Sequence, residues 1–331
     1  MTIHQNSAPE GITRIVIFDT NAYRNLPFGL SCVKAKEFAR RLADAEQAAS
    51  TKALVNPFVL WELVSHLADT HDPAYPKCMS AIVALVEHTR QACDDAGGIC
   101  RIADGETELC RQLFQRLPPN AEQNSANLSK LASYVWKEAP LLSAPNAQAN
   151  FRTFRAAMEE REMKWLDHVE AMLSRFRSID DFAGTLEEQK SEIKKRRDYL
   201  KGAGFVRDMA VGKAMSIAAL LGLTPLQDEI KAAGDLMERN FSTSLKLMQK
   251  TLANWFDAPE MNLRNPEKRR ANFIWDTAIC YGIGADRAVG NAKILFVTSE
   301  NAICEAAEDA GCGDCVMKLT EYLKSVLPTK S

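Results

Sequence analysis

Two carboxylates stand shortly after apolar segments that are far apart in the chain. Asp19 directly follows residues 14–18 (Arg-Ile-Val-Ile-Phe), and Glu300 comes soon after residues 293–297 (Lys-Ile-Leu-Phe-Val). Both segments are continuous and rich in β-branched residues, which is typical of strands buried on both faces of a parallel sheet. Ligands bind such sheets at the carboxyl ends of the strands. The two acids therefore indicate a shared site, although a single acid after a strand is more often a helix cap or a solvated loop residue.

Two amphipathic helices add further acids. The first is expected from about 58 to 69 and places Glu62 nearly opposite its apolar face. The second is expected from Pro266 to about Gly284, and three of its polar residues, spaced i, i+3 and i+7, share one stripe. These residues are Arg269, Asn272 and Asp276. Spacing alone favours the simpler interpretation, in which both helices turn their acids to solvent.

Strand and helix patterns alternate at both ends of the chain, which predicts an α/β fold with a parallel sheet flanked by helices. The N-terminal part is expected to contain strands at 14–18 and 53–55 and helices near 32–49, 58–69 and 77–96. The C-terminal part is expected to contain strands at 293–297 and 314–317 and helices near 301–310 and 320–326. Strands 14–18 and 293–297 should be neighbours or near-neighbours in this sheet.

The middle of the chain has few strand patterns and long stretches of good helix formers between proline breaks. Helices are expected near 122–138, 148–178, 185–201, 206–221 and 226–256, and the aromatic residues Phe151, Phe154 and Trp165 are expected in a core. The chain is therefore divided into an α/β domain in two parts, 12–98 and 266–327, and a mostly α-helical insertion at 99–265. The insertion should pack beside the sheet.

Four segments of the α/β domain, in this order, resemble segments of the PIN-domain nuclease family, so the resemblance implies a PIN-like parallel sheet flanked by helices. The segments are Ile15-Val-Ile-Phe-Asp19-Thr-Asn21, Asn56-Pro-Phe-Val-Leu-Trp-Glu62-Leu, Phe273-Ile-Trp-Asp276-Thr-Ala-Ile279 and Leu295-Phe-Val-Thr298-Ser-Glu300. The tail 316–323 also resembles the family's last strand and helix, so the resemblance covers about 12–95 and 266–327. Two features depart from the family: Glu300 stands where an aspartate is usual, and roughly half of the chain, in the middle, has no counterpart.

The resemblance implies a divalent-metal-dependent nuclease that hydrolyses phosphodiester bonds, and we expect an endoribonuclease. Asp19 and Asp276 would be the principal ligands of one or two Mg²⁺ or Mn²⁺ ions, which prefer hard oxygen donors. Glu62 and Glu300 would bind through water or orient the attacking water. Asn21 and Thr298 are candidates for hydrogen bonds to these ligands or to substrate, although either residue could equally serve only in a turn.

Binding of nucleic acid must depend on local basic patches, because the formal net charge of the chain is -2. The candidates closest to the acids are Lys268, Arg269, Arg270 and Asn272, and Arg264 lies close by in the sequence. A second basic stripe at helical spacing consists of Lys190, Lys194, Arg197 and Lys201. Such a stripe is more often a solvated helix face than a contact for nucleic acid.

Other interpretations stay open. The chain could be an inactive PIN-like scaffold whose helical insertion binds a protein partner or a second copy, or it could be a DNA- or structure-specific nuclease. A phosphatase of the haloacid-dehalogenase type also places an aspartate after its first strand, but it needs a second aspartate at the position of Asn21. The glycine patterns of P-loop and Rossmann proteins are absent from the sequence.

The sequence also predicts where the protein resides. The first residues, 1–13, are polar and do not resemble a signal peptide, and no apolar run is long enough to span a bilayer. The chain has nine cysteines, an odd number, with one Cys-x-x-Cys pair at Cys312 and Cys315. These features predict a cytoplasmic protein with reduced thiols and no membrane partner.

Overall fold

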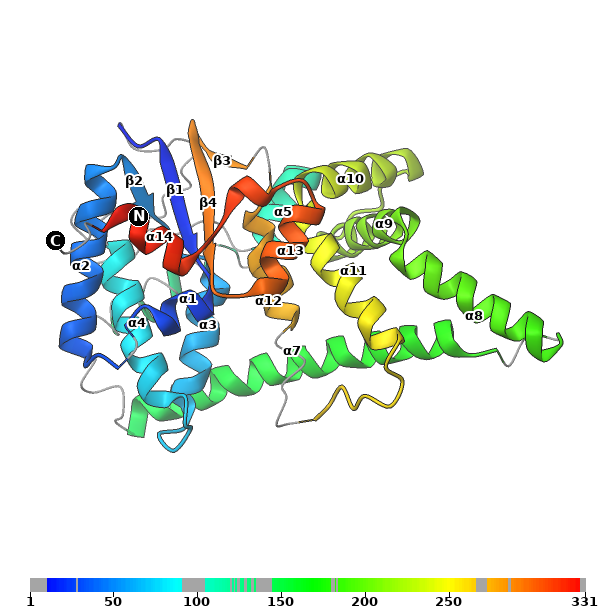
Figure 1. Cartoon of the computed structure of the whole chain (residues 1–331), viewed down its shortest axis with the longest axis horizontal. Helices are drawn as coiled ribbons and strands as arrows, with labels where there is room; N and C mark the ends of the chain where they lie inside the picture. The colour runs from blue at the N-terminus through cyan, green and yellow to red at the C-terminus, as the bar shows by residue number, and fades with distance from the viewer. Residues whose placement is uncertain are drawn as a thin grey trace.

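The structure is a computed structural model of the chain, in which helices surround one small sheet (Figure 1). It describes residues 11–27, 29–90, 105–119, 145–179, 184–265, 273–284 and 287–327, together with single positions between 121 and 134 and at 182.

The sheet joins the two ends of the chain. Its strands are β1 (Arg14–Phe18), β2 (Thr51–Ala53), β3 (Ala288–Val289), β4 (Ala292–Thr298) and β5 (Val316–Lys318). They follow the order β2-β1-β4-β3, and β5 pairs with the end of β4. The pairs β1–β2, β1–β4 and β4–β5 are parallel, whereas β3 runs antiparallel to β4. The predicted pairing of the two apolar segments is confirmed, with Phe18 opposite Val297.

Four helices follow the N-terminal strands. They are α1 (Thr20–Asn25), α2 (Cys32–Ala48), α3 (Pro57–Ser65) with the 3₁₀ turn η1 (His66–Ala68), and α4 (Tyr75–Arg90). Asn56 caps α3 because its side chain accepts a hydrogen bond from the Phe58 amide (3.0 Å), and Pro57 fills the first helical position. Strand β2 begins two residues earlier than the predicted strand at 53–55.

The described part of the insertion is helical, as predicted. Its helices are α5 (Gly105–Phe114), α7 (Pro145–Arg177), α8 (Leu186–Lys201), α9 (Ala203–Leu220), α10 (Gln227–Asn240) and α11 (Ser242–Phe256). Helix α7 spans much of the length of the molecule in Figure 1, from beneath α3 and α4 toward α8. Most of the predicted helix at 122–138 lies outside the described residues.

The single helix predicted at 226–256 is wrong, because the chain breaks at Phe241 between α10 and α11. The Phe241 side chain is fully buried in a cluster with residues of α5, α9 and α10. Its ring lies 5.6 Å from that of Tyr281, and the Arg287 guanidinium stands over it at 5.3 Å. Tertiary packing of this aromatic ring therefore sets the break, which no proline or glycine marks in the sequence.

One hydrophobic core runs from the sheet into the insertion. The same cluster of buried residues contains Val16 and Phe296 from the sheet, Phe151 from α7 and Trp255 from α11. Trp165 and Phe154 pack against this cluster, which confirms the core positions predicted for the aromatic residues of α7. The insertion and the sheet therefore stabilise each other through shared apolar contacts.

The remaining elements close the chain around the sheet. They are α12 (Phe273–Ile279), η5 (Cys280–Gly282), α13 (Asn301–Asp309), η6 (Gly313–Cys315) and α14 (Leu319–Val326).

An ion pair joins the segment before β3 to α5. The Arg287 guanidinium donates a hydrogen bond to the Glu108 carboxylate at 2.6 Å. Burial alone would raise the pKa of Glu108, but the guanidinium groups of Arg111 and Arg287 outweigh it and lower that pKa to about 2. Among the helices of the described ranges, none combines the length and apolar character that a membrane span requires.

Candidate active site

The site lies where β1 and β4 end side by side. The parallel register continues one residue past β1, where the Asp19 amide donates to the Val297 carbonyl at 3.0 Å. The Thr298 hydroxyl, at the end of β4, donates to the Asp19 carboxylate. Two residues separated by 279 positions are therefore in direct contact, as the pairing of their strands requires.

Asp19 is almost fully buried and caps α1. Its Oδ1 accepts a hydrogen bond from the Ala22 amide at 2.5 Å, while Oδ2 accepts the one from Thr298. Burial raises the pKa of Asp19 from 3.8 to about 7, because a buried carboxylate loses its hydration. The two hydrogen bonds oppose this rise, and the negative charges of Glu300 and Glu62 add to it.

The first turn of α1 also contacts both glutamates. The Thr20 hydroxyl donates to Glu62 Oε2 at 2.6 Å, and the Asn21 amide group donates to Glu300 Oε1 at 2.5 Å. Both glutamates are half-buried. The Glu300 amide in turn donates to the Thr298 hydroxyl at 2.8 Å. Asn21 and Thr298, predicted as hydrogen-bonding neighbours of the acids, thus lie in contact with Glu300 and Asp19.

Asp276 approaches the same place from α12 and is half-buried. Burial is the largest cause that raises its pKa well above the usual value, followed by the negative charges of Glu62, Asp19 and Glu300. Helix α12 is held against α3, which carries Glu62, by the rings of Phe58 and Trp275 at 5.6 Å. The structure therefore brings all four predicted acids into electrostatic contact from four separate segments.

The carboxylates nevertheless do not form a finished metal site. Across the described ranges, no group of three or more His, Cys, Asp or Glu side chains is arranged to hold a metal ion. Three of the acids are instead engaged with the chain itself, because Asp19, Glu62 and Glu300 each accept a hydrogen bond from Thr298, Thr20 or Asn21.

The predicted basic contacts fall into two groups. Lys268, Arg269, Arg270 and Asn272 lie outside the described residues. The stripe on α8 is described, and much of it is paired with acids at the surface: Arg197 and Lys201 both bind Asp257, at 2.7 and 2.8 Å, and Lys190 lies 3.3 Å from Glu187. Arg264 is likewise paired, with Asp167 and with Glu170 at 2.7 Å. These ion pairs favour the interpretation of a solvated helix face.

Sequence reasoning missed two residues that border the acids, Thr20 and Lys318, and a partly buried arginine of α1, Arg24. Thr20 stands between Asp19 and Asn21, so its place in the motif could have identified it. Lys318 ends β5 beside β4, and its ammonium lies 2.7 Å from Asn301 Oδ1, close to Glu300 in the chain. Arg24, in α1, has a buried Nε with no hydrogen-bond partner in the described part of the chain. The topology of the sheet would have pointed to Lys318, but no sequence signal marks Arg24.

Comparison with known proteins adds no relative to this picture. No protein-family model, curated protein or solved structure matches the chain.

Proposed function

We propose that the chain is a divalent-metal-dependent nuclease that cleaves RNA internally, with its active site at Asp19, Glu62, Asp276 and Glu300. One observation carries the proposal: the acids gather at the first turn of α1, where Thr20 and Asn21 bond Glu62 and Glu300, and burial there raises the pKa values of Asp19 and Asp276. Such perturbed groups in one place are typical of functional sites. For Asp276, no cation of the described residues is among the groups that shift its pKa.

The donor set suits Mg²⁺ or Mn²⁺. Both ions prefer oxygen ligands, and a bound dication would offset the mutual repulsion of the four carboxylates. Asp19 and Asp276 are the proposed direct ligands. When bound, the ion supplies an activated water and neutralises charge on the phosphoryl oxygens. To bind the ion, the acids would have to give up hydrogen bonds within the chain, such as the one that Glu62 accepts from Thr20.

The side chains around the acids hold them in place. Thr298 fixes one oxygen of Asp19 while the Ala22 amide fixes the other. Glu62 and Glu300 are more exposed than Asp19. They are therefore the acids that can reach an attacking water and accept its proton. Thr20 and Asn21 orient these two glutamates from the first turn of α1.

The choice of RNA rests on the resemblance of the four motifs to PIN-domain nucleases. An inactive scaffold is the second candidate, and one observation favours it. No ready set of three ligands is present in the described ranges. The two candidates differ in a simple way, since a scaffold should neither bind Mn²⁺ at the acids nor cleave nucleic acid.

The test is incubation of end-labelled single-stranded RNA and DNA of one sequence with the protein, in Mn²⁺ or in EDTA. We expect RNA cleavage in Mn²⁺ and none in EDTA. Asp19→Asn should slow cleavage by more than about 100-fold, because even residues that only hydrogen-bond to metal ligands contribute 10- to 100-fold. Asp198→Asn, the same change at an exposed position of α8, is the control and should cleave like wild type.

The outcomes separate the candidates. Intact RNA under all conditions, or equal cleavage by wild type and Asp19→Asn, would contradict the nuclease. Cleavage of DNA but not of RNA would keep the metal site and overturn the choice of substrate.

A further inference from the structure

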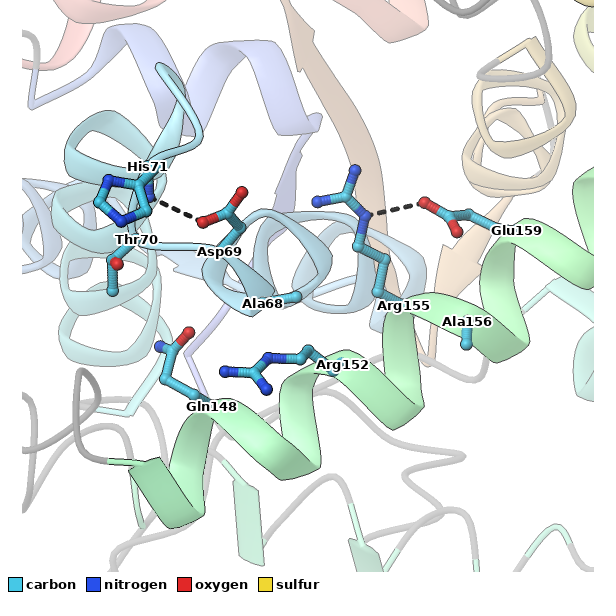
Figure 2. A pocket seen from close by; sticks show the side chains of 9 residues that line it. All are labelled: Ala68, Asp69, Thr70, His71, Gln148, Arg152, Arg155, Ala156 and Glu159. Atoms are coloured by element: carbon cyan, nitrogen blue, oxygen red, sulfur yellow. Dashed lines mark hydrogen bonds and ion pairs between the residues drawn. The ribbon is translucent and has the colours of Figure 1, made fainter.

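A groove of about 670 Å³ lies between the turn after α3 and the N-terminal half of α7 (Figure 2). The turn contributes Asp69, Thr70 and His71, and α7 contributes Arg152 and Arg155. Figure 2 shows the Arg152 side chain lying in the space between α7 and this turn. The volume is within the range of about 300–1,000 Å³ that is usual for ligand sites.

The groove is continuous with the helix that carries Glu62. Ala68, which lines the groove, is six residues beyond Glu62, through the end of α3 and the 3₁₀ turn η1. At about 1.5 Å per α-helical residue and about 2.0 Å per 3₁₀ residue, the backbone at Ala68 lies roughly 10 Å from that at Glu62. Helix α7 is packed against α3 there, with the rings of Phe154 and Trp61 6.2 Å apart. A strand bound at the acids could therefore continue into the groove.

The charged side chains that line the groove differ in how far they are paired with opposite charges. Arg155 is held by Glu159 at 2.8 Å and lies 3.9 Å from Asp72, so its charge is largely offset. The carboxylate of Asp69 accepts a hydrogen bond from the His71 amide at 2.9 Å. Arg152 is exposed, and the described part of the chain gives its guanidinium no hydrogen bond or ion pair. One cation in the groove is thus open to an anion.

We propose that this groove binds the single-stranded RNA that flanks the phosphate to be cleaved, with Arg152 contacting a phosphate of that strand. The proposal rests on the proposed function. A guanidinium fork matches two phosphate oxygens, and contacts of this kind position a strand without reading its sequence. Thr70 and His71 line the opposite wall with further polar groups.

Binding and cleavage are measured separately. The probe is a labelled ten-nucleotide RNA in EDTA, followed by fluorescence anisotropy, for wild type, Arg152→Ala and Arg175→Ala. Arg175 is the matched control, because it is an exposed arginine of the same helix, 23 residues or about 35 Å further along. Arg152→Ala should raise the Kd about fivefold at low salt and reduce the slope of log K against log salt by about 1. Arg175→Ala should change neither.

A charge reversal sharpens the test. Arg152→Glu should weaken binding more than Arg152→Ala, because it places a negative charge where the phosphate is proposed to bind. Equal affinities for wild type and Arg152→Ala, equal losses in the Arg152 and Arg175 variants, or no binding by wild type would overturn the proposal. Manganese-dependent RNA cleavage by wild type tests the proposed nuclease activity independently. If wild type cleaves RNA but Arg152→Ala binds RNA as tightly as wild type, the proposed role of the groove is wrong and the nuclease proposal stands.

Discussion

Replacing Asp276 by Asn is expected to raise the melting temperature of the metal-free protein at neutral pH. Burial raises the pKa values of both Asp276 and Asp19, and the charges of Glu62, Asp19 and Glu300 add to the rise for Asp276. Removing one charge while nearly keeping the shape relieves that repulsion. For Asp19, a rise in pKa from 3.8 to about 7 corresponds to about 4 kcal/mol of lost stability once the group is ionised. The Asp276→Asn variant should therefore melt at a higher temperature than wild type.

The pH dependence has a definite sign. A carboxyl group whose pKa is raised in the folded state contributes stability below its unfolded pKa and loses it as pH rises through the folded pKa. The metal-free wild type should therefore lose stability between about pH 4 and pH 7, and Asp276→Asn should lose less. Added Mn²⁺ should stabilise wild type by about 2.7 kcal/mol at a hundredfold excess over its Kd, and the variant by much less.

Thermal melts with and without Mn²⁺, at several pH values, check both statements. Asp198→Asn makes the same change at an exposed position and should follow wild type in every condition. Two outcomes would show that Asp276 is no part of a metal site. Either Asp276→Asn melts like Asp198→Asn in every condition, or Mn²⁺ stabilises wild type and Asp276→Asn equally.

The second large effect is expected away from the acids, in a buried polar network that joins four helices. Glu46 of α2 accepts a hydrogen bond from Tyr322 of α14 at 2.7 Å, and its other oxygen lies 2.7 Å from His88 Nε2 of α4. His88 Nδ1 lies 3.0 Å from the hydroxyl of Tyr23, which belongs to α1. All four side chains are buried. Burial, together with the charge of Glu46, raises the pKa values of Tyr23 and Tyr322 and keeps both phenols protonated.

Glu46→Ala should destabilise the protein by about 3–5 kcal/mol, because removing one member of a buried pair leaves its partners without hydrogen bonds. Glu46→Gln keeps the volume and an acceptor oxygen, so a smaller loss is expected. The control is Glu37→Ala, an exposed glutamate of the same helix, which should change stability by no more than about 0.5 kcal/mol. Urea denaturation measures all three. A loss in Glu46→Ala no larger than in the control would show that the network does not hold these helices together.

The network also bears on the site, because Tyr23 belongs to the short helix whose first turn contacts three of the acids. Tyr23 is two residues beyond Asn21, which bonds Glu300, and four beyond Asp19. Its contact with His88 fixes α1 against α4. The network therefore connects to the helix whose Thr20 and Asn21 bond Glu62 and Glu300.

The sheet was the most predictable part of the molecule. Residues 14–18 form β1 and residues 293–297 lie in β4, and each is a short, mainly apolar run rich in β-branched and aromatic residues, which is typical of a parallel strand covered on both faces. Their pairing followed from the same argument, and it places Asp19 beside Thr298. The convergence of Glu62 and Asp276 could not be obtained from spacing, which favoured solvent-facing helices. It was anticipated only through the resemblance of the motifs to a known family.

Features that depend on tertiary contacts could not be predicted. The break at Phe241 is set by packing of its ring against Tyr281, in a segment whose local pattern is continuous helix. The His88–Glu46 pair joins residues 42 positions apart on two helices, and neither residue belongs to a recognisable motif. The hydrogen bonds of Thr20 and Asn21 to the glutamates likewise depend on how α1 is placed against α3 and β4.

The most direct test of the central claim is the position of Mn²⁺ in a crystal of the wild-type protein, located by its anomalous scattering. The four acids should hold an ion with oxygens of Asp19 and Asp276 at about 2.0–2.6 Å, and with Glu62 and Glu300 bound directly or through water. Crystals of Asp19→Asn grown under the same conditions should lose that peak. An ordered site with all four carboxylates present and no manganese beside them, at millimolar concentration of the ion, would contradict a metal-dependent active site.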